Sequence, residues 1–146
     1  MRTKIFYISV FLIFVLLLSS CTGELLTDKE LIVKVIEDFF SALSEQKWDL
    51  AKSYCVDGSL AYAAVDNVKK NLEDLSSQCF IATINTSADI SKVDDIVGDK
   101  ALAYGYLTIV TKCDDKEIPG GGSMEFKFGL QKIGHNWKLI GWAPVY

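Results

Sequence analysis

Apolar and polar positions follow three different spacings along this chain of 146 residues. Residues 5–18 form an uncharged, mainly apolar run, and from residue 28 to residue 75 the apolar residues recur every three or four positions. Beyond residue 79 apolar and polar residues alternate. These spacings indicate an apolar leader, then amphipathic helices, then half-buried strands.

The helical half begins with Thr27 and Glu30, which are spaced as a capping box ahead of an apolar stripe. This pattern predicts a helix over residues 28–44 and a shorter one over residues 48–55, ended by the turn dipeptide Asp57-Gly58. A third helix is expected after Ser59, with apolar residues on one side from Leu60 to Leu75. The first residues of that segment would also suit a small strand.

The second half predicts strands over residues 79–90 (extended through 93–97), 101–112, 124–131 and 136–143. Gly98-Asp99 and Gly134-His135 suit tight hairpin turns, and residues 113–123 read as a polar loop. Helices followed by strands predict an α+β domain over residues 27–146. In it, N-terminal helices pack on one face of a curved, four-stranded antiparallel sheet.

The N-terminal apolar run has the layout of an export signal. Arg2 and Lys4 precede it, and small residues lead to Cys21. It is short for a membrane-spanning helix, which needs about 20 apolar residues. The tetrad Leu18-Ser19-Ser20-Cys21 resembles a prokaryotic lipobox. That resemblance implies a cleaved signal peptide over residues 1–20, diacylglycerol on Cys21 and a tether over residues 21–26.

Two alternatives remain for this segment: an uncleaved anchor helix, and a signal peptide without lipid. All three readings place the domain outside the cytoplasm, and the lipid reading attaches it to a membrane of the cell envelope through Cys21.

Without residues 1–20 the chain has 13 basic and 19 acidic residues. This acidic balance argues against a nucleic-acid partner, which requires a basic face. It also argues against docking on anionic lipid head groups.

Three cysteines remain for the folded domain once Cys21 carries lipid. Cys79 and Cys113 lie at the start and end of strands expected to pair, so we predict a disulfide between them, with Cys55 free. The alternative is three buried, inert thiols. The cysteine spacings are long and His135 is the only histidine, so no metal site is expected.

Three segments share a pattern with a known superfamily: residues 35–43, residues 48–51 and, near the end, residues 134–140. Together they resemble the nuclear-transport-factor-2-like superfamily, which has a cone-shaped, cystatin-like fold. Small prokaryotic lipoproteins of this kind include proteins of unknown function and a lumazine-binding type. Enzymes of the superfamily place Asp, His or Tyr inside the cone. Here His135 falls in a hairpin turn, so no catalytic residue is carried over and no cofactor is expected.

An aromatic set is the candidate ligand pocket, because pockets are mostly apolar with a few polar groups. Its members are Tyr62, Tyr104, Tyr106, Phe126, Phe128 and Trp142. The alternative is ordinary core between helices and sheet. We therefore expect a membrane-anchored lipoprotein whose non-catalytic domain binds a small apolar or aromatic ligand. The alternatives are a scaffold whose sheet face holds a partner protein or a second copy, and an isomerase- or lyase-type enzyme.

Overall fold

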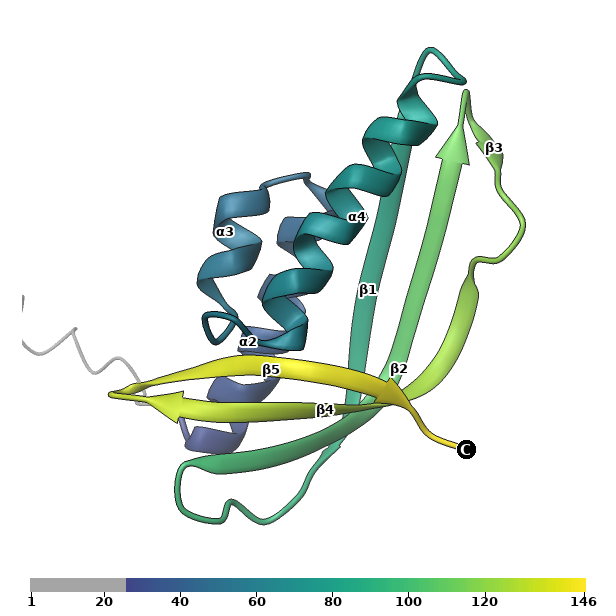
Figure 1. Cartoon of the computed structure of the whole chain (residues 1–146). Coiled ribbons are helices and arrows are strands. Elements are labelled where there is room, and N and C mark those ends of the chain that lie inside the picture. The colour runs from purple at the N-terminus through teal and green to yellow at the C-terminus, as the bar shows by residue number, and fades with distance from the viewer. Residues whose placement is uncertain (1–25) are drawn as a thin grey trace, which may run out of the picture.

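The computed structural model describes residues 26–146. Cys21 and the expected signal peptide and tether therefore lie outside the described residues, apart from Leu26. Within residues 26–146, three helices precede five strands (Figure 1). The elements are α2 (Asp28–Ser44), α3 (Trp48–Ser53), α4 (Leu60–Ser76), β1 (Ala82–Val93), β2 (Lys100–Cys113), β3 (Lys116–Glu117), β4 (Gly122–Ile133) and β5 (Asn136–Pro144).

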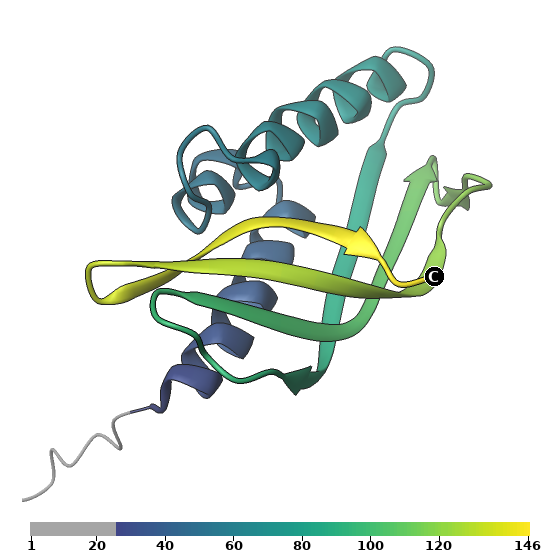
Figure 2. The ribbon, with the colours of Figure 1, turned by 60° about the horizontal axis from the view of Figure 1, so that its bottom comes forward.

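The strands form one antiparallel sheet in the order β1-β2-β4-β5, and the short β3 pairs with the end of β2. Figures 1 and 2 show that the sheet curves strongly and that the helices lie on one side of it. The register shifts between Ile90 and Lys92 and again between Gly129 and Leu130. Such irregularities bend a strand and increase its twist, so they account for part of the curvature.

The core lies between α2 and the sheet. Phe39 and Phe40 of α2 are buried against Phe128 of β4 and Leu139 of β5. The capping box at the start of α2 is formed as expected, with Thr27 accepting from the Glu30 amide and the Glu30 carboxylate accepting from the Thr27 amide.

The expected α+β class, with helices on a curved antiparallel sheet, is confirmed, and residues 60–76 are helical throughout. Two details differ. The predicted polar loop contains β3, so the sheet has five strands and not four. The first strand ends at Val93, so the expected extension over residues 93–97 is not part of it, and Val97 makes only an isolated bridge with Lys100.

The two edge strands of the sheet, β5 and β1, have different neighbours. The end of α3 runs alongside β5, where the Leu139 amide donates to Tyr54 O at 2.8 Å and the Val56 amide donates to Leu139 O at 2.9 Å. The opposite edge strand is β1, which packs beside α2. This second edge borders the candidate site.

Candidate functional site

Three of the six predicted pocket aromatics gather inside the curve of the sheet. Trp142 lies 5.5 Å from both Phe39 and Phe40 between ring centroids, and Phe128 lies 6.0 Å from Phe40. Phe126 stacks at 6.5 Å on Phe128. These rings touch one another, so here the cone interior is packed core and leaves no ligand cavity among them.

The other three predicted pocket residues lie elsewhere, so the proposed set does not form one pocket. Tyr104 and Tyr106 are opposite Lys127 and Glu125 on the outer face of the sheet, and Tyr106 is 51% exposed. Tyr62 is on α4, with the Lys52 ammonium 4.7 Å from its ring centroid.

The positions of the tyrosines follow from which face of β2 points toward the helices. Ala103 and Leu107 face the helices and are buried, and Gly105 lies between them on the same face. Phe39 and Phe40 belong to the same buried cluster as Ala103 and Leu107. The small Ala103 and Gly105 leave room for these rings on the inner face, and the tyrosines of β2 take the opposite face.

A groove between α2 and β1 has a volume of about 500 Å³. Apolar side chains of Leu26 and Val33 line it from the helix side, and those of Ile90 and Val93 line it from the strand. A further hollow of about 320 Å³ continues it past Glu37 to Ser44 and Thr86. The groove therefore follows α2 over most of its length.

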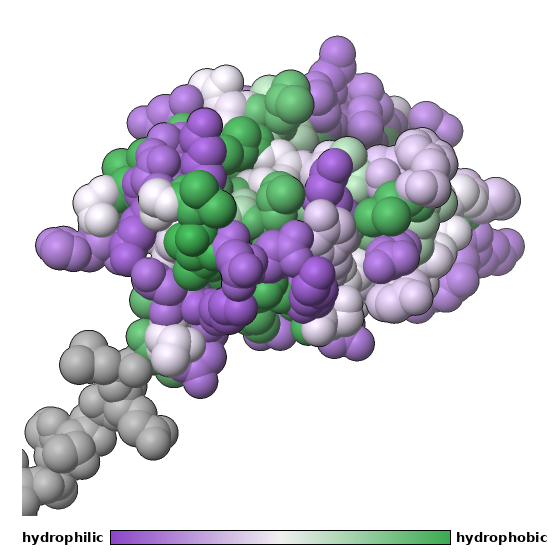
Figure 3. All heavy atoms as spheres, turned by 90° about the horizontal axis from the view of Figure 1, so that it is seen from below, coloured by the Kyte–Doolittle hydropathy of each residue, from purple (hydrophilic) through white to green (hydrophobic). Residues whose placement is uncertain are grey.

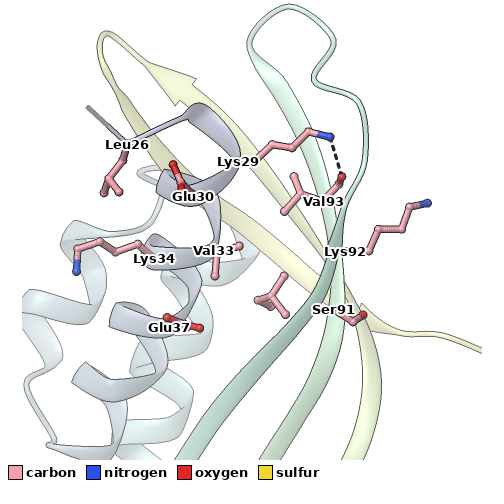
Figure 4. A pocket seen from close by; sticks show the side chains of 10 residues that line it. Leu26, Lys29, Glu30, Val33, Lys34, Glu37, Ser91, Lys92 and Val93 are labelled. Atoms are coloured by element: carbon pink, nitrogen blue, oxygen red, sulfur yellow. Dashed lines mark hydrogen bonds between the residues drawn. The ribbon is translucent and has the colours of Figure 1, made fainter. Parts of the chain in front are cut away.

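The charged groups around this groove are mostly paired. Lys34 bonds Asp38 at 3.0 Å and Lys92 bonds Asp94 at 2.5 Å. The Lys29 ammonium donates to Val93 O at 3.4 Å (Figure 4). Figure 4 also shows Val33 between helix and strand, while Lys34 and Lys92 extend away from it. The groove floor is thus apolar and its rim is charged.

These pairings stabilise the charged forms. The hydrogen bond to Asp38 raises the pKa of Lys34, and the one to Asp94 raises the pKa of Lys92. The backbone amide of Thr27 lowers the pKa of Glu30. Each shift moves the pKa of its group further from neutral pH. A general acid or base requires the opposite, a pKa near the working pH.

Ser44 and Thr86 close one end of the groove. The Ser44 hydroxyl accepts from the Thr86 amide at 2.7 Å and donates to the Thr86 carbonyl at 2.9 Å. The Thr86 hydroxyl donates to Phe40 O at 2.7 Å. One helical side chain therefore satisfies both main-chain groups of a residue on the sheet edge.

A second hollow, of about 400 Å³, lies at the other end of the sheet. Leu102, Gly129 and Ile140 line it, and Val97 from the loop after β1 covers one side. Asp94 and Asp95 lie at its border. Its lining is mostly apolar with few polar groups, as in small-molecule sites.

The sequence pattern does not predict either hollow. Val33 falls outside the buried stripe of α2, between Glu30 and Glu37 on the exposed side. An apolar residue among charges on a helix face was the available signal, but single exposed apolar residues are common on protein surfaces.

Cys79 and Cys113 form a disulfide in the structure, with Cα atoms 5.7 Å apart, and Cys55 is buried and free. Burial raises the pKa of the Cys55 thiol to about 12, so it is not a reactive nucleophile. Within residues 26–146 no group of three potential metal ligands gathers. No helix in that range is long and apolar enough to cross a membrane.

Comparison with known proteins identifies the architecture. Neither a family model nor a curated protein matches the sequence. Among solved structures, an NTF2-like protein of unknown function from Shewanella oneidensis is similar with a TM-score of 0.58. It is 13% identical, over 78% of this chain and 95% of that one. The chain has the NTF2-like, cystatin-like fold.

Two further structures carry this fold. A cystatin-like protein of unknown function from Nostoc punctiforme has a TM-score of 0.54 at 19% identity, over 79% of this chain and 89% of that one. The β subunit of benzoate 1,2-dioxygenase from Burkholderia mallei has a TM-score of 0.57 at 13% identity, over 82% and 90%. The NTF2-like fold thus occurs in an enzyme subunit and in proteins without a known function, so function must be argued from the site.

Proposed function

We propose that this chain is a lipid-anchored, extracytoplasmic binding domain that holds a protein partner non-covalently in the groove between α2 and β1. The observation that carries this proposal is the pairing of a filled interior with an open groove. Phe39, Phe40 and Trp142 occupy the space in which an NTF2-like cone would hold a small ligand. The groove is open to solvent, has an apolar floor and extends along most of α2.

The position of the groove relative to the proposed anchor supports the same function. Leu26, the first described residue, lines the groove. Cys21 precedes it by only five residues, so a lipid on Cys21 would hold the groove close to the membrane surface. Figure 3 shows apolar surface in small patches separated by hydrophilic side chains on the face seen from below. A partner of the same membrane would meet this groove first.

Site-specific photo-crosslinking in the native host tests the proposal. A photoreactive amino acid replaces Val33 in the groove, Tyr106 on the outer sheet face, or Lys70 on the exposed side of α4. We expect protein-sized adducts from position 33 and none above background from position 70. Adducts from position 106 alone would move the binding surface to the sheet face and overturn the groove assignment.

Small-ligand binding is a second candidate, favoured by the apolar hollow beside Leu102 and Ile140. Native mass spectrometry of residues 22–146 purified from the host envelope tests it. A retained small molecule that is lost in Leu102→Glu and kept in Val33→Glu would place a ligand in that hollow. A mass equal to the polypeptide alone would contradict this candidate and leave the groove proposal unaffected.

The anchor has its own test. Cys21→Ala should remain a full-length precursor without lipid, or be released if another peptidase cuts it. Metabolic labelling with an alkyne fatty acid should mark the native protein and not the variant. Labelling of the variant would show that Cys21 does not carry the lipid.

A further inference from the structure

Unpaired main-chain groups on the β1 edge are the starting point. In an antiparallel pair, successive residues direct their amide and carbonyl groups alternately toward the partner strand and away from it. Thr86 directs both groups away from β2, since they bond the Ser44 hydroxyl. Ala88 and Ile90 have the same parity, so their main-chain groups also point outward.

No hydrogen bond within residues 26–146 reaches the outward groups of Ala88 and Ile90 from a side chain or a loop. On one side Ser44 bonds both main-chain groups of Thr86, and on the other side the exposed Lys29 ammonium donates to Val93 O at 3.4 Å. On the opposite edge, Tyr54 and Val56 bond the main-chain groups of Leu139 of β5. On the β1 edge, Ala88 and Ile90 form a short open stretch beside the groove.

We propose that the groove partner is an extended peptide segment that adds to the sheet as a strand along residues 87–92 of β1. This inference rests on the proposed function and names the form that its partner takes. Strand addition uses main-chain hydrogen bonds for affinity and flanking pockets for alternate side chains. Here α2 supplies the flank. Leu26 and Val33 face Ile90 and Val93 across the groove, so an apolar side chain of the peptide is accommodated at every second position.

The length of the open stretch favours a short peptide over a second copy of this chain. Two β1 strands pairing edge to edge would run over 12 residues each, but the Ser44 and Lys29 contacts close both ends. The register shift between Ile90 and Lys92 and the exposed Lys92 also interrupt long pairing, as edge-protecting features do. The remaining stretch matches a peptide of a few residues.

A displayed library of random 12-residue peptides, selected on residues 22–146, tests this inference. Selected peptides should bind with apolar residues at alternate positions. Val33→Glu should weaken them by at least about tenfold, since it puts a charge on the apolar floor. Leu50→Glu, a matched change on the exposed side of α3, should leave the affinity within about twofold.

Methylation of the peptide's main-chain nitrogens then separates strand addition from other groove binding without altering the protein. N-methylation at every second position should reduce affinity by about tenfold or more, because those amides donate to β1. The intervening positions should be much less sensitive.

Each contrary outcome has a distinct meaning. Groove-dependent binding without this alternation would overturn strand addition and keep the proposed function. Failure to select any peptide would overturn strand addition, while crosslinks from position 33 would still support the groove. Binding that Val33→Glu does not affect would overturn both. A dimer of residues 22–146 that Ile90→Lys dissociates would make the occupant a second copy and overturn the peptide assignment.

Discussion

The Ser44 hydroxyl bonds both main-chain groups of Thr86, 42 residues further along the chain. A side chain at the last position of α2 therefore takes the place of a neighbouring strand at the sheet edge. This contact ties α2 to β1 at one end of the groove and sets the depth at which the helix lies against the strand.

We predict that Ser44→Ala lowers the free energy of unfolding by about 1–3 kcal/mol, because it leaves a partly buried amide and carbonyl without partners. Ser41→Ala is the matched control, since the Ser41 hydroxyl makes only a 3.4 Å exposed contact with Glu45. Urea denaturation of both variants measures the difference. Equal losses would show that water replaces the Ser44 contact.

Asp28 should make stability depend on acid pH. Hydrogen bonds from Lys132 and then Trp137 lower the pKa of Asp28 below its ordinary value of 3.8. A lowered native pKa gives stability that is complete above the unfolded pKa and is lost as pH falls through the native one. Asp28→Asn should therefore flatten the fall in unfolding free energy below about pH 4.

Two comparisons sharpen this test. Asp89→Asn removes a carboxylate from an exposed strand position and should keep the steep acid dependence. The pKa of Glu30 is also lowered, by the backbone amide of Thr27, so Asp28→Asn should leave part of the dependence. An unchanged acid profile in Asp28→Asn would contradict the role given to the Lys132 and Trp137 contacts.

The fold followed from the sequence because local and periodic signals agree in it. The Thr27–Glu30 capping box and the stripe through Phe39 and Phe40 both predict α2, the alternation through Phe126 and Phe128 predicts β4, and both elements are present. Such signals depend on near neighbours in the chain, so they survive whatever the tertiary packing is.

The candidate site could not be predicted in the same way. Both faces of β2 carry apolar residues. From the sequence alone, the face with the larger side chains, which include Tyr104 and Tyr106, is expected to point inward. Which face is inner depends on the volume of Phe39 and Phe40 on a different element. The groove depends on where α2 lies relative to β1, a relation between residues such as Val33 and Ile90 that no spacing encodes.

Gly105 is predicted to be essential to the bent part of the sheet. A Cβ at this position would lie 2.2 Å from Asp89 O on the adjacent strand. Gly105→Ala should cost about 1–3 kcal/mol through forced backbone movement next to the irregularity at Ile90. Gly129→Ala, whose Cβ would meet only Gly141 O at 3.9 Å, should cost less in the same denaturation assay. The reverse order would contradict this account.

The cysteines should differ in reactivity. The Cys79–Cys113 bridge closes a loop of 34 residues, for which chain entropy predicts up to about 4 kcal/mol of stabilisation. Native protein from an oxidising compartment should therefore resist iodoacetamide at all three cysteines, because Cys79 and Cys113 are bridged and the Cys55 thiol is buried with a raised pKa. Unfolding without reductant should expose one thiol, and unfolding with reductant three. Labelling of two or three thiols without reductant would exclude the bridge.

Trp142 distinguishes a packed interior from a ligand pocket. Trp142 is partly buried and contacts Phe39 and Phe40, so its replacement by Ala should cost about 3 kcal/mol, through lost burial and a residual cavity. A residue lining an open pocket would instead be replaced at little cost to the ligand-free protein. Tyr106→Ala on the outer face is the control and should change stability far less.

A small aromatic compound that binds Trp142→Ala and raises its melting temperature, without binding the native domain, would show that the indole fills the space. Equal stability of the two variants would reopen the interior of the cone as a ligand site.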